Sequence, residues 1–285
     1  MDIKLRPDAV MVTKPVFNFP KFCEFIRNHT ELDPTNSINP EEFNKFNHND
    51  IIPMMAGKLC YLSFESGKGR NSARDHVGNM IKHKHGSVLE HTNIGFILMT
   101  SRDITHEIVR HRIASYSQLS QRYVNFPQYL MPPEFKGLYS TTDNDGVRIK
   151  TSEGDIYCYN DSPVHKWYKS IEFANDTYEN LAKDLGNLLD VGKISKTDAR
   201  KLVNQTARSV LPNSTITYLF MTTNIRSWRQ ILEKRCNRHA AVGIRMLFNK
   251  VYDLIVNEAP ACFQDYTKEM LDDGTFEIAS NTMAI

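Results

Sequence analysis

The chain has 285 residues, of which 41% are hydrophobic and 24% are charged, so it is long enough to bury a sizeable core. Its net charge is only +2, whereas a protein that binds nucleic acid over much of its surface is usually strongly basic. The chain has no apolar run of the roughly eighteen residues that a membrane span needs, and no secretory signal pattern at its start. We therefore expect a cytoplasmic protein with neither a membrane nor a nucleic-acid partner.

The first half of the chain alternates between short helical and extended patterns. Residues 1–50 are rich in Pro, Asn and Asp and are expected to form an N-terminal extension. Apolar spacing and turn residues predict a strand at 9–12, a short helix at 22–27, a helix at 72–84, a strand at 92–100 and a helix at 103–112.

The second half repeats this alternation after a polar, turn-rich segment at 135–165, which is expected to be an inserted loop or hairpin. A capping box beginning at Ser195 predicts a helix that ends near Arg208. Further patterns predict a helix at 164–185, a strand at 214–223 and a long helix whose apolar stripe, from Ile244 to Ile255, faces the core or a subunit interface. No internal repeat is present, so residues 1–285 are expected to form one domain.

The five cysteines indicate reduced thiols. Their number is odd, they are widely spaced, and none forms a Cys-x-x-Cys pair. A disulfide framework or a zinc knuckle is therefore not expected. Arg235 could lower the pKa of the neighbouring Cys236, although an isolated cysteine is more often inert packing.

Residues 110–123 concentrate donors that suit an anion. Arginine offers forked, charged donors and serine offers a short hydroxyl, so this segment could hold two or more phosphate groups. The alternative is a basic helix end that is simply solvated. The donors are Arg110, His111, Arg112, Ser115, Ser120 and Arg122.

The segment also carries a recognisable motif. Arg110-His111-Arg112, followed by seven residues and Ser120, resembles the signature of the flavin-dependent thymidylate synthases. Four further blocks follow the order and spacing of that family, so the resemblance extends over residues 55–257. The blocks are His85-Gly86-Ser87-Val88-Leu89-Glu90-His91, Ala207-Arg208-Ser209-Val210-Leu211-Pro212, Thr223-Asn224-Ile225-Arg226-Ser227-Trp228, and Arg235 with His239-Ala240.

The resemblance implies an α/β (α+β) fold with a central mixed or antiparallel sheet flanked by helices, not a Rossmann fold. The implied enzyme is a methyltransferase that converts dUMP to dTMP by FAD-dependent reductive methylation at C5. Methylenetetrahydrofolate would donate the one-carbon unit and NADPH would be the reductant. Members of the family are homotetramers with shared active sites, and a homotetramer is accordingly expected here.

Site residues are implied by position within the matching motifs. Arg235 is the implied catalytic residue, and no metal ligand is implied. Cofactor binding is implied for His85, Ser87, Arg110, His111, Arg112, Gln118, Asn224, Arg226, Gln230 and His239. Substrate binding is implied for Glu107, Arg110, Gln118, Leu119, Ser120, Gln121, Arg122, Arg208 and Arg235.

Four positions depart from the family pattern, and two of them, Ala241 and Gly243, replace the Gln and Glu usual after the His-Ala pair. Glu107 stands where most relatives have Gln, and Gln118 stands where most have Glu. If both side chains share the nucleotide pocket, the exchange moves one negative charge without removing it. The alternative is an altered base, since a carboxylate can accept from an exocyclic amine such as N4 of cytosine, which would make dCMP the substrate.

Two functions from other classes remain open. His83, His85, Glu90 and His91 are residue types that could ligate zinc or iron in a hydrolase, although their spacing fits no closed ligand set. Alternatively, the arginine segment with Tyr116 and Tyr123 could bind RNA, whose bases stack on aromatic rings.

Overall fold

The computed structural model describes residues 1–38, 47–65, 72–125, 127–143, 145–189 and 195–282. The chain divides into two compact units, each assembled from segments that are distant in the sequence. Unit 1 consists of Met1–Asp8, Leu98–Arg110 and Ser117–Leu219, and unit 2 consists of Ala9–Ile97, His111–Tyr116 and Phe220–Ile285. No helix in the described ranges is both long and apolar enough to cross a membrane.

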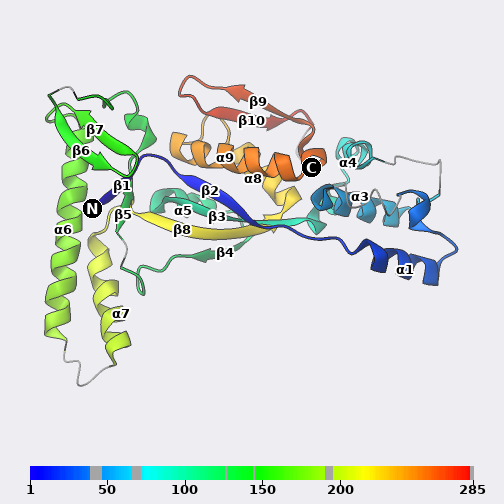
Figure 1. Cartoon of the computed structure of the whole chain (residues 1–285), viewed down its shortest axis with the longest axis horizontal. Coiled ribbons are helices and arrows are strands. Elements are labelled where there is room, and N and C mark those ends of the chain that lie inside the picture. Colours follow the sequence, from blue (N-terminus) through cyan, green and yellow to red (C-terminus); the bar gives the residue numbers. More distant parts are fainter. Residues whose placement is uncertain (39–46, 66–71, 126, 144, 190–194, 283–285) are drawn as a thin grey trace. The chain divides into compact units, whose positions relative to one another are not determined.

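A four-stranded sheet has the strand order β2-β3-β8-β4 (Figure 1). Its strands are β2 (Asp8–Thr13), β3 (Asn93–Ser101), β8 (Ile216–Asn224) and β4 (Ser115–Gln118). The predicted strands at 9–12, 92–100 and 214–223 correspond to β2, β3 and β8. Together with the flanking helices, this sheet confirms the predicted α+β class.

Unit 1 contains two further pairs of strands and the helices α5, α6 and α7. Strands β1 and β5 pair in parallel, whereas β6 and β7 form an antiparallel hairpin. Its elements are β1 (Asp2–Lys4), α5 (Arg102–Ile108), β5 (Gln128–Leu130), η3 (Pro133–Phe135), β6 (Val147–Thr151), β7 (Gly154–Cys158), α6 (Pro163–Leu188), α7 (Lys196–Ala207) and η4 (Arg208–Val210).

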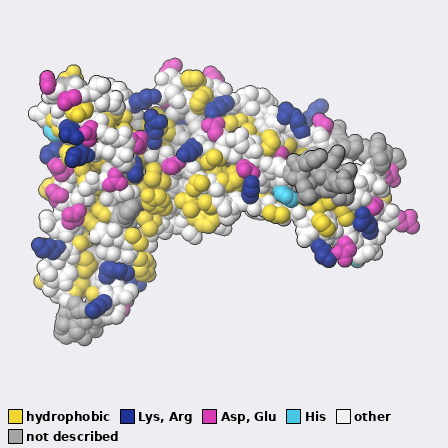
Figure 2. All heavy atoms as spheres, in the orientation of Figure 1, with side chains coloured by type: hydrophobic (Ala, Val, Ile, Leu, Met, Phe, Trp, Pro, Cys, Tyr) yellow, Lys and Arg dark blue, Asp and Glu magenta, His cyan; other side chains and the backbone are white. Residues whose placement is uncertain are grey.

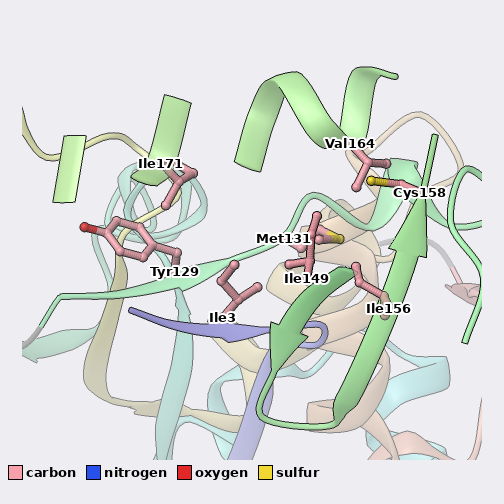
Figure 3. Packing of buried hydrophobic residues seen from close by; sticks show 8 residues of the cluster. All are labelled: Ile3, Tyr129, Met131, Ile149, Ile156, Cys158, Val164 and Ile171. Atoms are coloured by element: carbon pink, nitrogen blue, oxygen red, sulfur yellow. The ribbon is translucent and has the colours of Figure 1, made fainter. Parts of the chain in front are cut away.

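The predicted insertion at 135–165 contributes to the core of unit 1. Ile149, Ile156 and Cys158 of the β6–β7 hairpin pack against Ile3 of β1 and Ile171 of α6 (Figure 3). Each fully buried aliphatic side chain contributes about 1.5–3 kcal/mol. The hairpin alternative is therefore confirmed, and the segment is part of the packing of unit 1.

Helices α6 and α7 lie side by side in unit 1 (Figure 1). Helix α7 begins where the capping box predicted, because the Ser195 Oγ accepts a hydrogen bond from the Asp198 backbone N–H at 3.1 Å. Hydrophobic side chains are visible along the surface of this pair of helices (Figure 2). Among the exposed ones are Phe173 and Leu188, whose exposed fractions are 74% and 80%.

Unit 2 contains the remaining helices and the C-terminal hairpin. Its elements are α1 (Phe19–His29), η1 (Pro34–Asn36), α3 (His48–Cys60), α4 (Ala73–Lys82), η2 (Gly86–His91), α8 (Ile225–Arg235), α9 (Val242–Glu258), η5 (Pro260–Phe263), β9 (Tyr266–Met270) and β10 (Phe276–Ser280). Helix α8 packs on β3: the Trp228 ring lies 5.1 Å from that of Phe96, and its Nε1 donates to the Ile94 carbonyl at 3.1 Å. The stripe on α9 faces the core, as predicted.

The helix predicted at 103–112 begins within one residue of α5 but is predicted too long at its C-terminal end. Helix α5 ends at Ile108, so the arginine motif follows the helix in the chain. The helical pattern continues in the sequence, but hydrogen bonds from residues later in the chain hold the next segment in another conformation. The Tyr116 hydroxyl donates to the His111 carbonyl at 2.7 Å, and the Thr223 hydroxyl donates to the Ile113 carbonyl.

Candidate functional site

In unit 2, an arginine and a histidine of the predicted site are directly bonded. Arg235 is the last residue of α8, and its Nε donates to His111 Nε2 at 2.9 Å. Burial and the charges of Arg235 and Lys234 lower the pKa of His111 to about 4. The imidazole is therefore neutral at physiological pH. Because Nε2 accepts, the ring proton lies on Nδ1.

A cavity of about 380 Å³ lies in the same unit. Three of its lining residues, His85, Ser87 and Arg226, were predicted from the sequence as cofactor-binding residues. Arg226 is held by an ion pair, since its Nη1 lies 2.6 Å from Glu90 Oε1. The cavity thus brings a hydroxyl, an imidazole and a guanidinium around a space that could accept part of a ligand.

Sequence reasoning missed several residues that line this cavity, among them Gly57, Tyr61 and Lys84. The Tyr61 hydroxyl lies 3.5 Å from His85 Nδ1. A Cβ on Gly57 would lie 2.6 Å from His76 Nε2, so only glycine fits there without a shift. A glycine inside a helical pattern is a signal of such close packing, and it could have drawn attention to α3.

Three other predicted cofactor residues are not among the side chains that line the cavity. The Asn224 Oδ1 caps α8 by accepting from the Ser227 N–H at 2.8 Å. Gln230 and His239 are exposed. The side chain of Asn224 therefore stabilises the start of α8 in this structure, although its sequence motif predicted cofactor binding.

In unit 1, the predicted substrate-binding residues include buried donors without acceptors. Arg122 Nε and Gln121 Nε2 are both buried and have no hydrogen-bond partner in the described part of the chain. Leaving a buried donor unsatisfied costs about 1–3 kcal/mol. The Ser120 hydroxyl, in turn, accepts from the Arg122 backbone N–H at 3.4 Å. An anionic ligand would supply the missing acceptors.

The exchanged pair of residues lies in unit 1. Gln118 Nε2 donates to the Thr105 hydroxyl at 3.2 Å and to the Thr217 hydroxyl at 3.3 Å. Glu107 follows two residues after Thr105 on α5 and is exposed. The amide of Gln118 is thus oriented by two threonines, which leaves its oxygen as an acceptor.

Of the two interpretations of Cys236, the structure supports inert packing rather than a lowered pKa. Burial raises the pKa of its thiol to about 12 and outweighs the nearby positive charge, so the thiol stays protonated. All five cysteines are free in the structure. Among the described residues, no three His, Cys, Asp or Glu side chains are grouped so that they could hold a metal ion.

Comparison with known proteins agrees with the sequence motifs. A family model described as thymidylate synthase complementing protein matches residues 44–261. The chain is 33% identical over 236 residues to the flavin-dependent thymidylate synthase of Mycobacterium leprae (strain Br4923), covering 80% of this chain and 84% of that protein. It is 35% identical over 234 residues, with the same coverage, to the flavin-dependent thymidylate synthase of Mycolicibacterium gilvum (strain PYR-GCK).

The fold resembles that of a solved structure. The structure of PolB, a UMP/dUMP methylase from Streptomyces cacaoi bound with 5-Br dUMP, matches with a TM-score of 0.62. The match covers 93% of this chain and 96% of PolB at 16% identity. At that identity the likeness concerns the fold.

Proposed function

Because the chain belongs to the flavin-dependent thymidylate synthase family, we propose that it methylates dUMP at C5 to give dTMP. FAD supplies the redox chemistry when bound, NADPH is the reductant, and methylenetetrahydrofolate is the one-carbon donor. The observation in this structure that best supports a nucleotide substrate is the pair of buried donors on Gln121 and Arg122, which lack acceptors in the described chain.

FAD binding is assigned to residues of the matching motifs. The cavity lined by His85, Ser87 and Arg226 supports this assignment, since a guanidinium and a hydroxyl suit a diphosphate. Arg110 and Arg112 add exposed positive charges that form no ion pair with a described residue. The complete proposed set is His85, Ser87, Arg110, His111, Arg112, Gln118, Asn224, Arg226, Gln230 and His239.

The nucleotide is assigned to a second group of residues. Its 5′-phosphate is a dianion, and Ser120, Arg122 and Arg208 supply a hydroxyl and two guanidinium groups for it. The proposed substrate set also contains Glu107, Arg110, Gln118, Leu119, Gln121 and Arg235. The family match and the unsatisfied donors in the segment that carries Arg122 support this set.

Arg235 is the proposed catalytic residue. In this role its guanidinium donates to the N3–O edge of uracil and stabilises negative charge there, which raises electron density at C5. The hydrogen bond to neutral His111 supports the role, because it restrains the guanidinium before substrate binds. A cysteine adduct is not needed, which agrees with the protonated state of the Cys236 thiol.

We propose a cytoplasmic homotetramer in which residues 1–285 of each subunit form one domain. Exposed apolar side chains on α6, including Phe173 and Leu188, support a subunit contact, since such patches often mark interfaces. Light scattering of the purified protein should give about four times the subunit mass of 32.9 kDa. A monomer at micromolar concentration would contradict the proposed assembly.

The proposal is tested by recording the visible absorption spectrum before and after addition of FAD. Oxidation of NADPH is then followed without nucleotide, with dUMP and with dCMP. A flavin spectrum with oxidation that dUMP stimulates is the expected result. Preference for dCMP would assign the activity to another pyrimidine nucleotide, whereas RNA binding that falls with salt, in the absence of flavin binding, would favour the RNA-binding alternative.

A further inference from the structure

Arg102 was not assigned a role by the sequence motifs, but its backbone lies beside the segment that carries Arg208. Arg102 is the first residue of α5, and its N–H donates to the carbonyls of Asn213 and Thr215, both at 3.0 Å. These two residues follow η4, which begins at Arg208. The side chain of Arg102 is half-buried.

Arg122 is joined to the same region through Asn204 of α7. The Asn204 carbonyl accepts from the Arg208 N–H, while its Nδ2 donates to the Arg122 carbonyl at 3.4 Å. Asn204 is buried, with 4% of its surface exposed. Hydrogen bonds thus bring Arg102, Arg122 and Arg208, which we call the arginine cluster, to one region of unit 1.

The arginine cluster lacks negative partners. None of its three side chains forms an ion pair or hydrogen bond with another residue in the described ranges, and burial together with the charge of Arg208 lowers the pKa of Arg102. The buried arginines of unit 2 are different, because Arg229 pairs with Asp265 and Arg245 with Asp273. Positive groups gathered without a carboxylate form a site that suits an anion, which can accept charge-assisted hydrogen bonds from them.

We propose that Arg102 is a further substrate-binding residue, which donates to the 5′-phosphate of the nucleotide alongside Arg208. This inference rests on the proposed function and extends it by one residue. A phosphate monoester has three terminal oxygens, so it can accept from more than one guanidinium at once. Arginine suits this role better than lysine because its fork presents paired donors.

The test compares ligands with and without the phosphate on the FAD-loaded protein. Calorimetry gives the affinities of wild type and Arg102→Gln for dUMP and for deoxyuridine. We expect the substitution to weaken dUMP binding about 10- to 100-fold, as for loss of a charge-assisted hydrogen bond, and to leave deoxyuridine binding unchanged. Arg102→Lys should recover part of the affinity and serves as the second variant if Arg102→Gln does not fold.

A matched control is Arg200→Gln, which removes an exposed charge from α7 and should leave dUMP affinity within about twofold. Unchanged dUMP affinity in Arg102→Gln, or equal weakening of dUMP and deoxyuridine, would overturn the role of Arg102. Failure of wild type to bind dUMP would instead overturn the proposed function. If wild type does not bind dUMP, titration of both proteins with inorganic phosphate tests the role of Arg102 independently of the proposed function. Phosphate binding that is present in wild type and lost in Arg102→Gln supports this role. Equal binding in the two proteins, or no binding in either, overturns it.

Discussion

Replacing His111 by phenylalanine removes the acceptor to which Arg235 Nε donates at 2.9 Å. A hydrogen bond to a charged group contributes about 1.5–3 kcal/mol, so loss of this restraint should lower kcat/KM about 10- to 100-fold. His111→Gln keeps an acceptor and should lose less. The assay is dUMP-stimulated oxidation of NADPH by the FAD-loaded protein.

Burial of His111 and the nearby charges of Arg235 and Lys234 make the stability of the fold depend on pH. The pKa of His111 is about 4 in the folded protein, against 6.5 for the free side chain. Between these values the unfolded chain binds more protons, so this contribution is fully present above pH 6.5 and is lost as pH falls toward 4. Each unit of pKa difference corresponds to about 1.4 kcal/mol, so the contribution of His111 to the free energy of unfolding is about 3 kcal/mol in total. About 2 kcal/mol of this contribution is lost between pH 7 and pH 5.

Urea unfolding at pH 7 and pH 5 measures this contribution. The difference in unfolding free energy between wild type and His111→Phe should shrink by about 2 kcal/mol on acidification. His106→Phe, which changes an exposed histidine on α5, is the control and should show no comparable change. A pH-independent difference for His111→Phe would refute a neutral, buried acceptor at this position. Equal kcat/KM in the two His111 variants would refute the restraint of Arg235.

Three further predictions concern the cavity, the thiol and the exchanged pair. Gly57→Ala would place a Cβ 2.6 Å from His76 Nε2, so FAD affinity measured by flavin fluorescence should fall about tenfold or more, and unchanged affinity would show that the cavity does not hold the cofactor. Cys236→Ala should retain dTMP formation within about threefold, because a thiol with a pKa near 12 is not a nucleophile, and abolished turnover in a folded variant would contradict this. Glu107→Gln combined with Gln118→Glu should have dUMP turnover closer to wild type than either single substitution, and equal damage from all three would disprove a compensated exchange.

The sequence predicted best those features that are set by local chemistry. The cap at Ser195 and the apolar spacing on α9 each depend on residues a few positions apart, and both agree with the structure. The end of α5 could not be predicted in this way. It depends on hydrogen bonds from Tyr116 and Thr223, and the latter lies 110 positions from its partner Ile113.

In the candidate site, too, residues within motifs could be predicted from the sequence, whereas residues brought in by tertiary packing could not. The motifs include His85 and Arg226, which line the cavity. Gly57 and Tyr61 line the same cavity but precede those motifs, and only tertiary packing brings them there. The sequence left a lowered pKa of Cys236 open because its adjacency to Arg235 is visible there, whereas the burial that raises this pKa is visible only in the structure.

Formation of dTMP from dUMP is the most direct measurement of the proposed reaction. The FAD-loaded protein would be incubated with dUMP, methylenetetrahydrofolate and NADPH, and the nucleotides separated by chromatography. We predict that dTMP accumulates with repeated turnover and that omission of methylenetetrahydrofolate abolishes it. A protein that binds FAD and dUMP but yields no dTMP under these conditions would contradict the proposed function.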